Sequence, residues 1–160
     1  MKMNFVLKRD HFAEGLRLQN LNRHEEALAA YDMAIRHSPI HSNAYYNRGV
    51  CLSNLNRHEE ALAAYDMAIK HDPTDSMAYC NRGACLYNLN RLDEALASYD
   101  MAIKHKPTLS AAYNNRGLCL NDLNRLDEAL ASYDMAIKHN PNDVDAINNR
   151  KLLLKKLESK

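Results

Sequence analysis

Residues 42–75 read SNAYYNRGVCLSNLNRHEEALAAYDMAIKHDPTD, and closely similar stretches recur along the chain. A shift of 34 residues nearly superimposes the sequence on itself. All prolines and all glycines follow this period: Pro39, Pro73, Pro107 and Pro141, and Gly15, Gly49, Gly83 and Gly117. A repeat of this length indicates an array of similar units that stack side by side.

Each unit is predicted to contain two helices. The first half of residues 42–75 places one set of side chains on a single helical face, and the second half traces another such face. The two sets are Tyr45, Arg48, Gly49 and Leu52, and Ala61, Leu62, Tyr65, Ala68 and Ile69. Between them, Asn56 is expected to take a left-handed conformation that closes the first helix, because Asn tolerates a positive φ better than most residues.

Charged residues and a proline mark the ends of the second helix. Glu59 and Glu60 fall in its first turn, where acidic groups favour the positive end of the helix dipole. Lys70 and His71 fall in its last turn, where cations favour the opposite end. Pro73 follows and stops the helix. The unit is therefore predicted to be a helical hairpin.

Small residues indicate where the two helices of a hairpin touch. Gly49 and Ala61 carry little or no side chain, so two antiparallel helices can approach closely there. Leu52 and Tyr65 supply the volume around that contact. One hairpin cannot bury both of its apolar faces alone, so neighbouring units must stack to form a continuous core.

The pattern Tyr45-x3-Gly49-x2-Leu52, followed by Ala61-x3-Tyr65-x2-Ala68-x4-Pro73, resembles the tetratricopeptide repeat, with Tyr45 at a place where that family prefers Trp. The resemblance implies an all-α fold, a right-handed α-solenoid of four helix-turn-helix repeats plus a C-terminal capping helix. First helices line the concave side in that family. The expected repeats are residues 8–41, 42–75, 76–109 and 110–143, and the capping helix spans 144–158, with Asp143 or Asn142 as its cap; all lie in a single domain, 1–160.

Composition excludes several classes of function. Lys and Arg number 21 against 20 Asp and Glu, so a net charge of +1 gives no argument for nucleic acid or an acidic surface. No apolar run is long enough to span a membrane. The opening stretch MKMNFVLKRDHF holds only a short apolar run, too short for a secretory signal. These features predict a cytoplasmic protein, with export through a machinery that needs no such signal left open.

A row of asparagines recurs on the side of the first helices that faces away from the predicted core. Asn47, Asn81, Asn115 and Asn149 are spaced by 34 residues. An amide side chain both donates and accepts hydrogen bonds, which suits the backbone of an extended peptide whatever its sequence. The row resembles the asparagine row in the repeat domain of the O-linked N-acetylglucosamine transferase. The alternative is that these residues cap or solvate helices, or were copied with each duplication.

Aromatic residues on the same stripe are expected to anchor a ligand, because aromatic side chains dominate binding hot spots. The alternative for each is an ordinary surface residue. The full predicted peptide-binding set is Phe12, Tyr46, Asn47, Asn81, Tyr87, Asn114, Asn115 and Asn149.

The four cysteines divide into two kinds. Cys51, Cys85 and Cys119 lie one repeat apart, at the same place in three first helices. Helices packed about 8–10 Å apart hold such residues too far from one another for a disulfide, so they are expected to be buried packing residues. Cys80 departs from this pattern and is expected on the wall of the groove, as an exposed thiol.

Three other kinds of site are disfavoured. Some tetratricopeptide domains use a two-carboxylate clamp, which needs a basic residue directly before the place of the asparagine row, here called the ladder. In the four units, the residues directly before that place are Phe12, Tyr46, Cys80 and Asn114. The repeated histidines (His37, His71, His105 and His139) end second helices one repeat apart and are not expected to converge on one zinc ion, so no metal and no cofactor is expected. No nucleophile–base pair and no Gly-rich phosphate loop is present, so catalysis is not expected.

The repeated arginines depart from the apolar residue common in the family at their place. Arg48, Arg82, Arg116 and Arg150 are expected to cover the edge of the core with their stems. Their charged heads would then reach acids such as Asp66 or Asp100. Phosphate binding by this row is the alternative.

These observations favour a non-enzymatic scaffold that binds an extended peptide or a helix of a partner protein in a concave groove. Nucleic acid and membrane partners are not expected. The alternative function is a structural module that self-assembles through its repeat ends, since the last helix carries Leu153, Leu154 and Leu157. The chain is accordingly expected to be a monomer or a weak homo-oligomer.

Overall fold

The computed structural model describes residues 10–159. Within this range it contains nine α-helices and no strand. The first two residues of the predicted repeat 8–41, and the opening stretch before them, lie outside the described residues. The helices are α1 (His11–Asn20), α2 (His24–His37), α3 (Ser42–Asn54), α4 (His58–His71), α5 (Ser76–Asn88), α6 (Leu92–His105), α7 (Ser110–Asp122), α8 (Leu126–His139) and α9 (Val144–Glu158).

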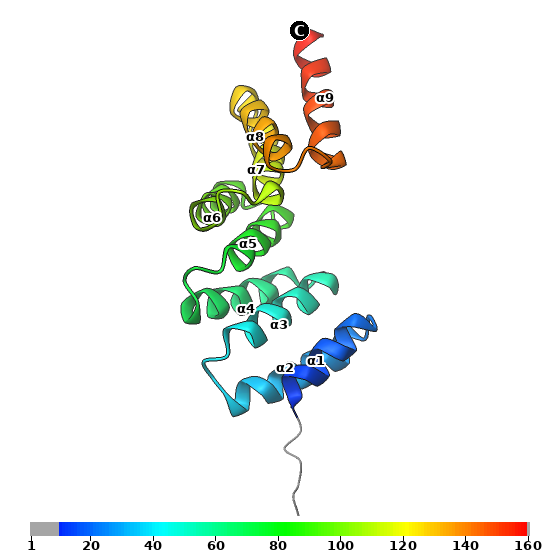
Figure 1. Ribbon diagram of the computed structural model, residues 1–160, viewed down its shortest axis with the longest axis vertical. Coiled ribbons are helices and arrows are strands. Elements are labelled where there is room, and N and C mark those ends of the chain that lie inside the picture. Colours follow the sequence, from blue (N-terminus) through cyan, green and yellow to red (C-terminus); the bar gives the residue numbers. More distant parts are fainter. Residues whose placement is uncertain (1–9, 160) are drawn as a thin grey trace, which may run out of the picture.

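The helices form hairpins that stack along the long axis of the molecule (Figure 1). The pairs α1/α2, α3/α4, α5/α6 and α7/α8 follow one another, and α9 stands at the C-terminal end. The predicted all-α solenoid is thereby confirmed. None of the described helices combines the length and the apolar character needed to cross a membrane.

Each hairpin turns at the asparagine that the sequence indicates. Asn22, Asn56, Asn90 and Asn124 have φ between 56 and 58°. This left-handed geometry lets the backbone N–H of the following arginine reach back to a carbonyl in the last turn of the first helix, as Arg57 does to Leu52 at 2.9 Å. The second helix then starts with the two acids in its first turn and ends at His71, before Pro73. The prediction of the hairpin is confirmed in detail.

A contact between a glycine and a tyrosine sets the distance within each hairpin. Tyr65 of α4 is 1% exposed and lies against Gly49 of α3. A Cβ atom at Gly49 would lie 2.7 Å from Cε1 of the tyrosine ring, which real structures do not tolerate. The same contact recurs in the other hairpins, as Gly15–Tyr31, Gly83–Tyr99 and Gly117–Tyr133. Only glycine allows the ring to sit directly on the backbone of the first helix.

A second aromatic contact closes the other end of three hairpins. Tyr45 is only half-buried, although it shares a helical face with the buried Gly49 and Leu52. Its ring stacks on His71 with centroids 5.6 Å apart. The pairs Tyr79–His105 and Tyr113–His139 repeat this stacking at 5.5 Å. Three of the four repeated histidines therefore pack against tyrosine faces at the ends of second helices, one in each of these three hairpins.

First helices lie on the inner side of the array. Cα atoms of α3 and α5, and likewise of α5 and α7, approach within 8 Å of one another. Among the described residues, no such approach occurs between consecutive second helices such as α4 and α6. Helices on the inside of a curved stack must lie closer together than those on the outside. The concave surface is therefore formed by α1, α3, α5, α7 and α9.

Arginines tie each unit to the one before it. Arg82 of α5 donates from Nε to Oδ1 of Asp66 on α4 at 2.6 Å, and from Nη1 to the buried Ser98 hydroxyl on α6 at 2.6 Å. Corresponding ion pairs join Arg48 to Asp32, Arg116 to Asp100 and Arg150 to Asp134. The expected pairing of the arginine heads with these acids is confirmed.

The cysteines correct one expectation from the sequence. Cys51, Cys85 and Cys119 are fully buried, as predicted, and are free thiols. The expectation that Cys80 is exposed on the groove wall is wrong, because its side chain is only 3% exposed. Cys80 is hydrogen-bonded to Asn115 of the next unit, and burial raises the pKa of its thiol to about 11.

Substitution of Gly83 by Ala should destabilise the protein. The new Cβ would lie 2.6 Å from Cε1 of Tyr99, and overpacking of this kind costs about 1–3 kcal/mol, although Ala alone would favour a helix by about 1 kcal/mol. Urea unfolding followed by circular dichroism measures the loss. Combining Gly83→Ala with Tyr99→Leu should cost less than the sum of the two single changes. A Gly83→Ala protein as stable as the wild type would contradict the contact.

The four thiols should resist modification in the folded protein. Burial raises the pKa of Cys51, Cys80 and Cys119 to about 11 and also raises that of Cys85, and only the thiolate reacts. Ellman's reagent at pH 8 should therefore react slowly with the native protein and with all four thiols in denaturant. Rapid reaction of one native thiol that disappears in a Cys80→Ala variant would show that Cys80 is accessible.

Candidate functional site

Three similar pockets lie in a row along the inner surface, at the α3–α5, α5–α7 and α7–α9 junctions between consecutive first helices. The α3–α5 pocket, the α5–α7 pocket and the α7–α9 pocket have volumes of about 180, 90 and 220 Å³. Their shared positions are Val50, Ser53, Tyr65, Asn81 and Ala84 in the first; Ala84, Tyr87, Tyr99, Asn115 and Leu118 in the second; and Leu118, Asn121, Tyr133, Asn149 and Leu152 in the third. Corresponding residues are 34 positions apart, so the repeat builds the same kind of pocket at each of these three junctions.

The tyrosine that rests on the hairpin glycine also lines each pocket. Tyr65, Tyr99 and Tyr133 are at most 2% exposed. Burial raises the pKa of all three phenols, that of Tyr133 to about 12, so they remain protonated and uncharged at neutral pH. The inner wall of each pocket is therefore an uncharged aromatic surface fixed by the packing of the hairpin.

Three asparagines of the predicted row, or ladder, line these pockets, and each of the three is hydrogen-bonded to a side chain of the preceding unit. Asn81 donates from Nδ2 to the Tyr46 hydroxyl at 3.1 Å. Asn149 donates from Nδ2 to Oδ1 of Asn114 at 3.0 Å. Asn115 is hydrogen-bonded to the buried Cys80 thiol, which lowers the pKa of that thiol and opposes the larger effect of burial. In all three pairs the partner lies 35 residues before the asparagine.

Asn47 differs because its counterpart partner is Phe12, which offers no hydrogen bond. The Asn47 amide instead donates to the backbone carbonyl of Asn43 on its own helix, at 2.9 Å. The three inter-unit bonds therefore orient Asn81, Asn115 and Asn149, while Asn47 turns back on α3. The sequence predicted all four as equivalent, and the structure brings three of them to pockets.

The oriented amides keep hydrogen-bonding capacity. An asparagine side chain has two N–H groups and one carbonyl oxygen. Asn149 uses one N–H, whereas Asn81 donates to Tyr46 and is also hydrogen-bonded to Tyr65; both side chains are half-buried, as is Asn115. A carbonyl oxygen remains for a ligand at Asn81, and a carbonyl oxygen and an N–H remain at Asn149.

The other members of the predicted set have distinct places. Tyr46 packs against Tyr65, with ring centroids 6.0 Å apart, and Asn114 is 8% exposed, so both act mainly as supports for ladder asparagines. Tyr87 lines the α5–α7 pocket and donates its hydroxyl to Oδ2 of Asp122 at 2.6 Å. This bond, together with burial, raises the pKa of Tyr87 to about 12.

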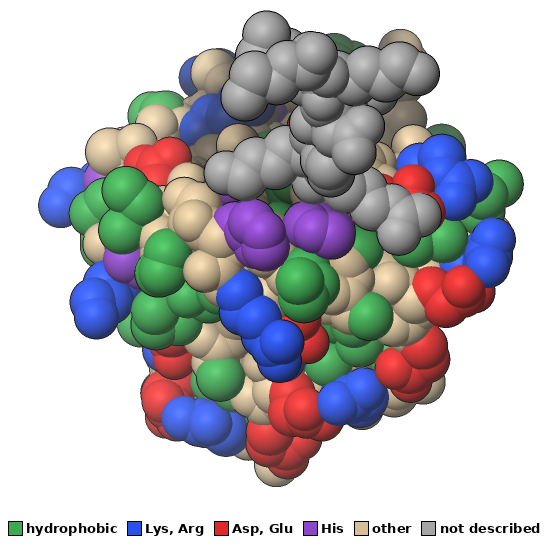
Figure 2. Space-filling model, turned by 90° about the horizontal axis from the view of Figure 1, so that it is seen from below, with side chains coloured by type: hydrophobic (Ala, Val, Ile, Leu, Met, Phe, Trp, Pro, Cys, Tyr) green, Lys and Arg blue, Asp and Glu red, His purple; other side chains and the backbone are tan. Residues whose placement is uncertain are grey.

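Phe12 lies apart from the row, at the N-terminal end of the molecule. Its ring contacts His41 and Tyr31, with centroids 4.6 and 6.0 Å away. It borders a separate pocket of about 260 Å³ that His11 and His37 also line. Figure 2, viewed onto this end, shows histidine side chains gathered there. Phe12 therefore does not belong to the three junction pockets.

The predicted peptide-binding set omitted two residues that line the pockets. Leu118 lines two adjacent pockets, and Lys156 lines the α7–α9 pocket, where its Nζ lies 3.5 Å from Oδ1 of Asn121. The sequence does contain a signal for Leu118, because Val50, Ala84 and Leu152 occupy the same position of the repeat and are also apolar. Lys156 has no counterpart of the same type in earlier units, so the repeat gave no signal for it.

The chemistry of the row is that of neutral hydrogen bonding beside small apolar surfaces. Among the described residues, Lys156 is the one charged residue that lines the three junction pockets. Within residues 10–159, no group of three His, Cys, Asp or Glu side chains is placed to hold a metal ion. The row can bind uncharged backbone groups and small side chains.

Comparison with known proteins assigns the chain to a family. Residues 12–76, and residues 76–109 and 110–143, match the tetratricopeptide repeat (TPR) family. Among curated proteins, no sequence matches the chain.

Several solved structures are similar. A double mutant of MamA from RS-1 has a TM-score of 0.84 at 21% identity over 92% of this chain and 83% of that one. The first TPR domain of Spaghetti (RPAP3) bound to the HSP90 peptide SRMEEVD has a TM-score of 0.71 at 21% identity over 73% and 93%. The TPR domain of OM64 from Arabidopsis has a TM-score of 0.69 at 26% identity over 71% and 94%.

Proteins of this family and fold are generally interaction modules without enzymatic activity. With the family matched across residues 12–143 and the solenoid shared with these neighbours, the chain belongs to the tetratricopeptide repeat family.

Proposed function

We propose that the protein is a scaffold that binds an extended segment of a partner protein along its concave surface. Asn81, Asn115 and Asn149 would hold the backbone of that segment, and the junction pockets would receive side chains. The observation that carries the proposal is the orientation of these three amides by side chains from the preceding unit, where each lines a junction pocket.

Fixed amides suit a ligand that is recognised through its backbone. A free carbonyl oxygen on the asparagine accepts from a peptide N–H, and a free N–H donates to a peptide carbonyl. Each such bond contributes about 0.5–1.5 kcal/mol. Because the amides are already held in place, less rotamer freedom is lost when a ligand binds. Such a row favours extended chains over compact surfaces.

A structural neighbour supports a peptide as the ligand. The first TPR domain of Spaghetti (RPAP3) is solved with the HSP90 peptide SRMEEVD, so a domain of this fold binds a short peptide. The surface of the present chain differs in charge, because Tyr46, Cys80 and Asn114 are uncharged at the places directly before the ladder positions. We therefore propose a neutral segment rather than an acidic tail.

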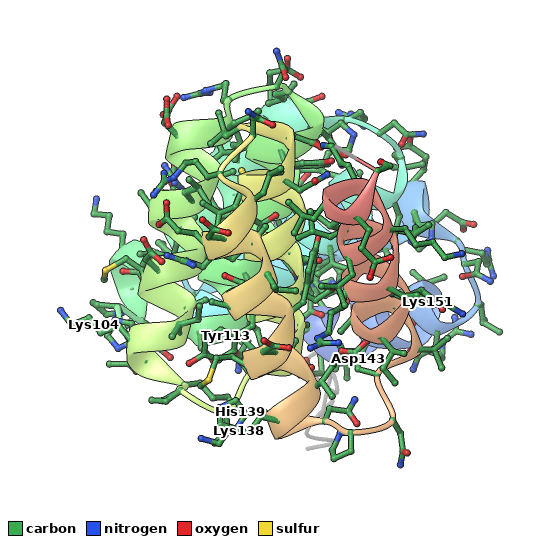
Figure 3. The ribbon with its side chains drawn as sticks, turned by 90° about the horizontal axis from the view of Figure 1, so that it is seen from above. Lys104, Tyr113, Lys138, His139, Asp143 and Lys151 are labelled. Atoms are coloured by element: carbon green, nitrogen blue, oxygen red, sulfur yellow. The ribbon has the colours of Figure 1, made fainter. Side chains whose placement is uncertain are left out.

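Self-assembly through the C-terminal end is the second candidate. Val144 and Leu152 of α9 are each 65% exposed, and a further pocket of about 550 Å³ lies between α8 and α9, lined by Ile137, Ile147 and Leu154. Figure 3, viewed onto this end, shows α9 beside α8 with Lys151 projecting from it. Lys151 stands where earlier first helices have glycine, so a further tyrosine-bearing helix cannot pack there as closely as within the array.

The ladder is tested by replacing Asn81, Asn115 and Asn149 together with Ala. Loss of several backbone hydrogen bonds should weaken peptide binding by about tenfold or more, while helicity stays unchanged because no replaced residue packs in the core. Peptides selected from a random display library on the wild-type protein supply the ligand, and fluorescence anisotropy gives the Kd. The matched control, Asn20→Ala with Asn142→Ala, changes exposed amides outside the pockets. Unchanged affinity in the triple variant would disprove the ladder.

The second candidate predicts a different observation. A monomeric scaffold should sediment with a constant coefficient from micromolar to near-millimolar concentration. Growth of the coefficient with concentration, abolished by Leu152→Glu on the exposed face of α9, would instead favour assembly through the C-terminal end.

A further inference from the structure

We infer that the segment bound by this row is a polyproline II helix that places a small side chain into a junction pocket at every third residue. The inference rests on the proposed function and specifies the ligand for the same surface. It follows from the spacing of the pockets, their volumes, their charge and the hydrogen-bonding groups at their mouths.

The spacing of the pockets follows from the packing of first helices. Pocket residues recur every 34 positions, so neighbouring pockets are related by the step from one unit to the next. First helices of consecutive units are in direct contact, with Cα atoms within 8 Å. The axes of packed helices lie about 8–10 Å apart. Side chains that enter successive pockets must therefore be separated by about the same distance.

A polyproline II helix has this spacing. It rises about 3.1 Å per residue with three residues per turn, so side chains at i, i+3 and i+6 share one face at steps of about 9.3 Å. A β-strand presents one face at steps of about 6.6–6.8 Å, which is too short, and about 13 Å for every fourth residue, which is too long. An α-helix repeats a face at about 5.4 Å per turn.

The hydrogen-bonding capacity of the three asparagines also distinguishes a polyproline II ligand from an α-helical one. Backbone N–H and C=O groups of an α-helix are bonded internally, so they would leave Asn81, Asn115 and Asn149 without ligand partners. A polyproline II helix has no internal hydrogen bonds. Its carbonyl groups, and the N–H groups of its non-proline residues, remain free for the amides at the pocket mouths.

The pocket volumes set the size of each side chain. The α5–α7 pocket, at about 90 Å³, is the smallest of the three. Tyr87 fills part of it, at the position where the α3–α5 pocket has Ser53 and the α7–α9 pocket has Asn121. The central side chain of the ligand must therefore be smaller than the two that flank it, such as Ala between two Val.

The charge beside the α7–α9 pocket indicates which kind of ligand residue lies near it. Every described residue that lines the α3–α5 and α5–α7 pockets is uncharged. Lys156 borders the α7–α9 pocket, and none of the described carboxylates forms an ion pair with it. An uncharged segment followed by an acidic residue near the third pocket matches this surface.

Selection from a peptide library tests whether the side chains that enter the pockets are spaced three residues apart. Random dodecapeptides are displayed and selected on the wild-type protein, and those that also bind the Asn81/Asn115/Asn149→Ala variant are removed. The enriched sequences should be rich in proline, with small apolar residues at intervals of three. If groove-dependent peptides are enriched with a period of two, or with helical spacing and without proline, the inference is overturned while the proposed function stands. If no peptide depends on the ladder, the proposed function itself falls.

Two synthetic peptides of one composition measure the effect directly. Val-Pro-Pro-Ala-Pro-Pro-Val-Pro-Glu has anchors at intervals of three, and Val-Pro-Ala-Pro-Val-Pro-Pro-Pro-Glu has them at intervals of two. The first should bind about tenfold more tightly, because the second removes anchor side chains from their pockets. Equal affinity would overturn the inference.

Substitution of Tyr87 by Ser tests the assignment of the central pocket. This change recreates the residue of the α3–α5 pocket, Ser53, in the smaller pocket. The variant should bind a peptide with Val in the central position more tightly than the Ala peptide, whereas the wild type should prefer Ala. Unchanged preference would show that the central side chain does not enter this pocket.

Discussion

The contact between a glycine in the first helix and a tyrosine in the second determines both the packing and the surface of this protein. Because Tyr65 lies directly on the backbone at Gly49, the two helices of the hairpin approach closely and the ring is removed from water. The edge of the same ring then lines the pocket at the junction with the next unit. Stability and the shape of the candidate binding surface thus depend on one contact, repeated in every hairpin. A substitution at the glycine or the tyrosine should therefore change both the stability and the shape of the candidate binding surface.

The glycine–tyrosine contact is the same in every hairpin, but the units differ at a few surface positions. These differences make the pockets along the groove distinct from one another. The partner that precedes each ladder asparagine by 35 residues is a phenol at Tyr46, a thiol at Cys80 and an amide at Asn114, and each orients the next unit's asparagine. Phe12 cannot do so, and Asn47 bonds to its own helix. Tyr87 narrows one pocket and Lys156 adds a charge to another. An array built from nearly identical units thereby acquires a polarity along its groove.

The sequence predicted the fold well because the decisive signals are local. Left-handed Asn56, the acids at Glu59 and Glu60, and Pro73 each act within a few residues, and the bounds of α9 agree with prediction. The surface was harder to predict, because contacts between residues 35 apart depend on the angle between units, which a sequence period does not contain. Cys80 and Asn114 therefore proved to be buried supports, and the pockets themselves emerged only when adjacent first helices were seen together. The assignment of the ladder to a ligand remains a prediction.

The most direct test of this account is the side-chain amide spectrum of the protein during titration with a selected peptide. Nitrogen-15 correlation spectra resolve the NH₂ groups of Asn81, Asn115 and Asn149 separately from those on other faces. The account predicts that these three signals shift and saturate together with the backbone amides of α5, α7 and α9, while Asn20 and Asn142 remain unchanged. Shifts confined to α4, α6 and α8, with the three ladder signals unaffected, would contradict it.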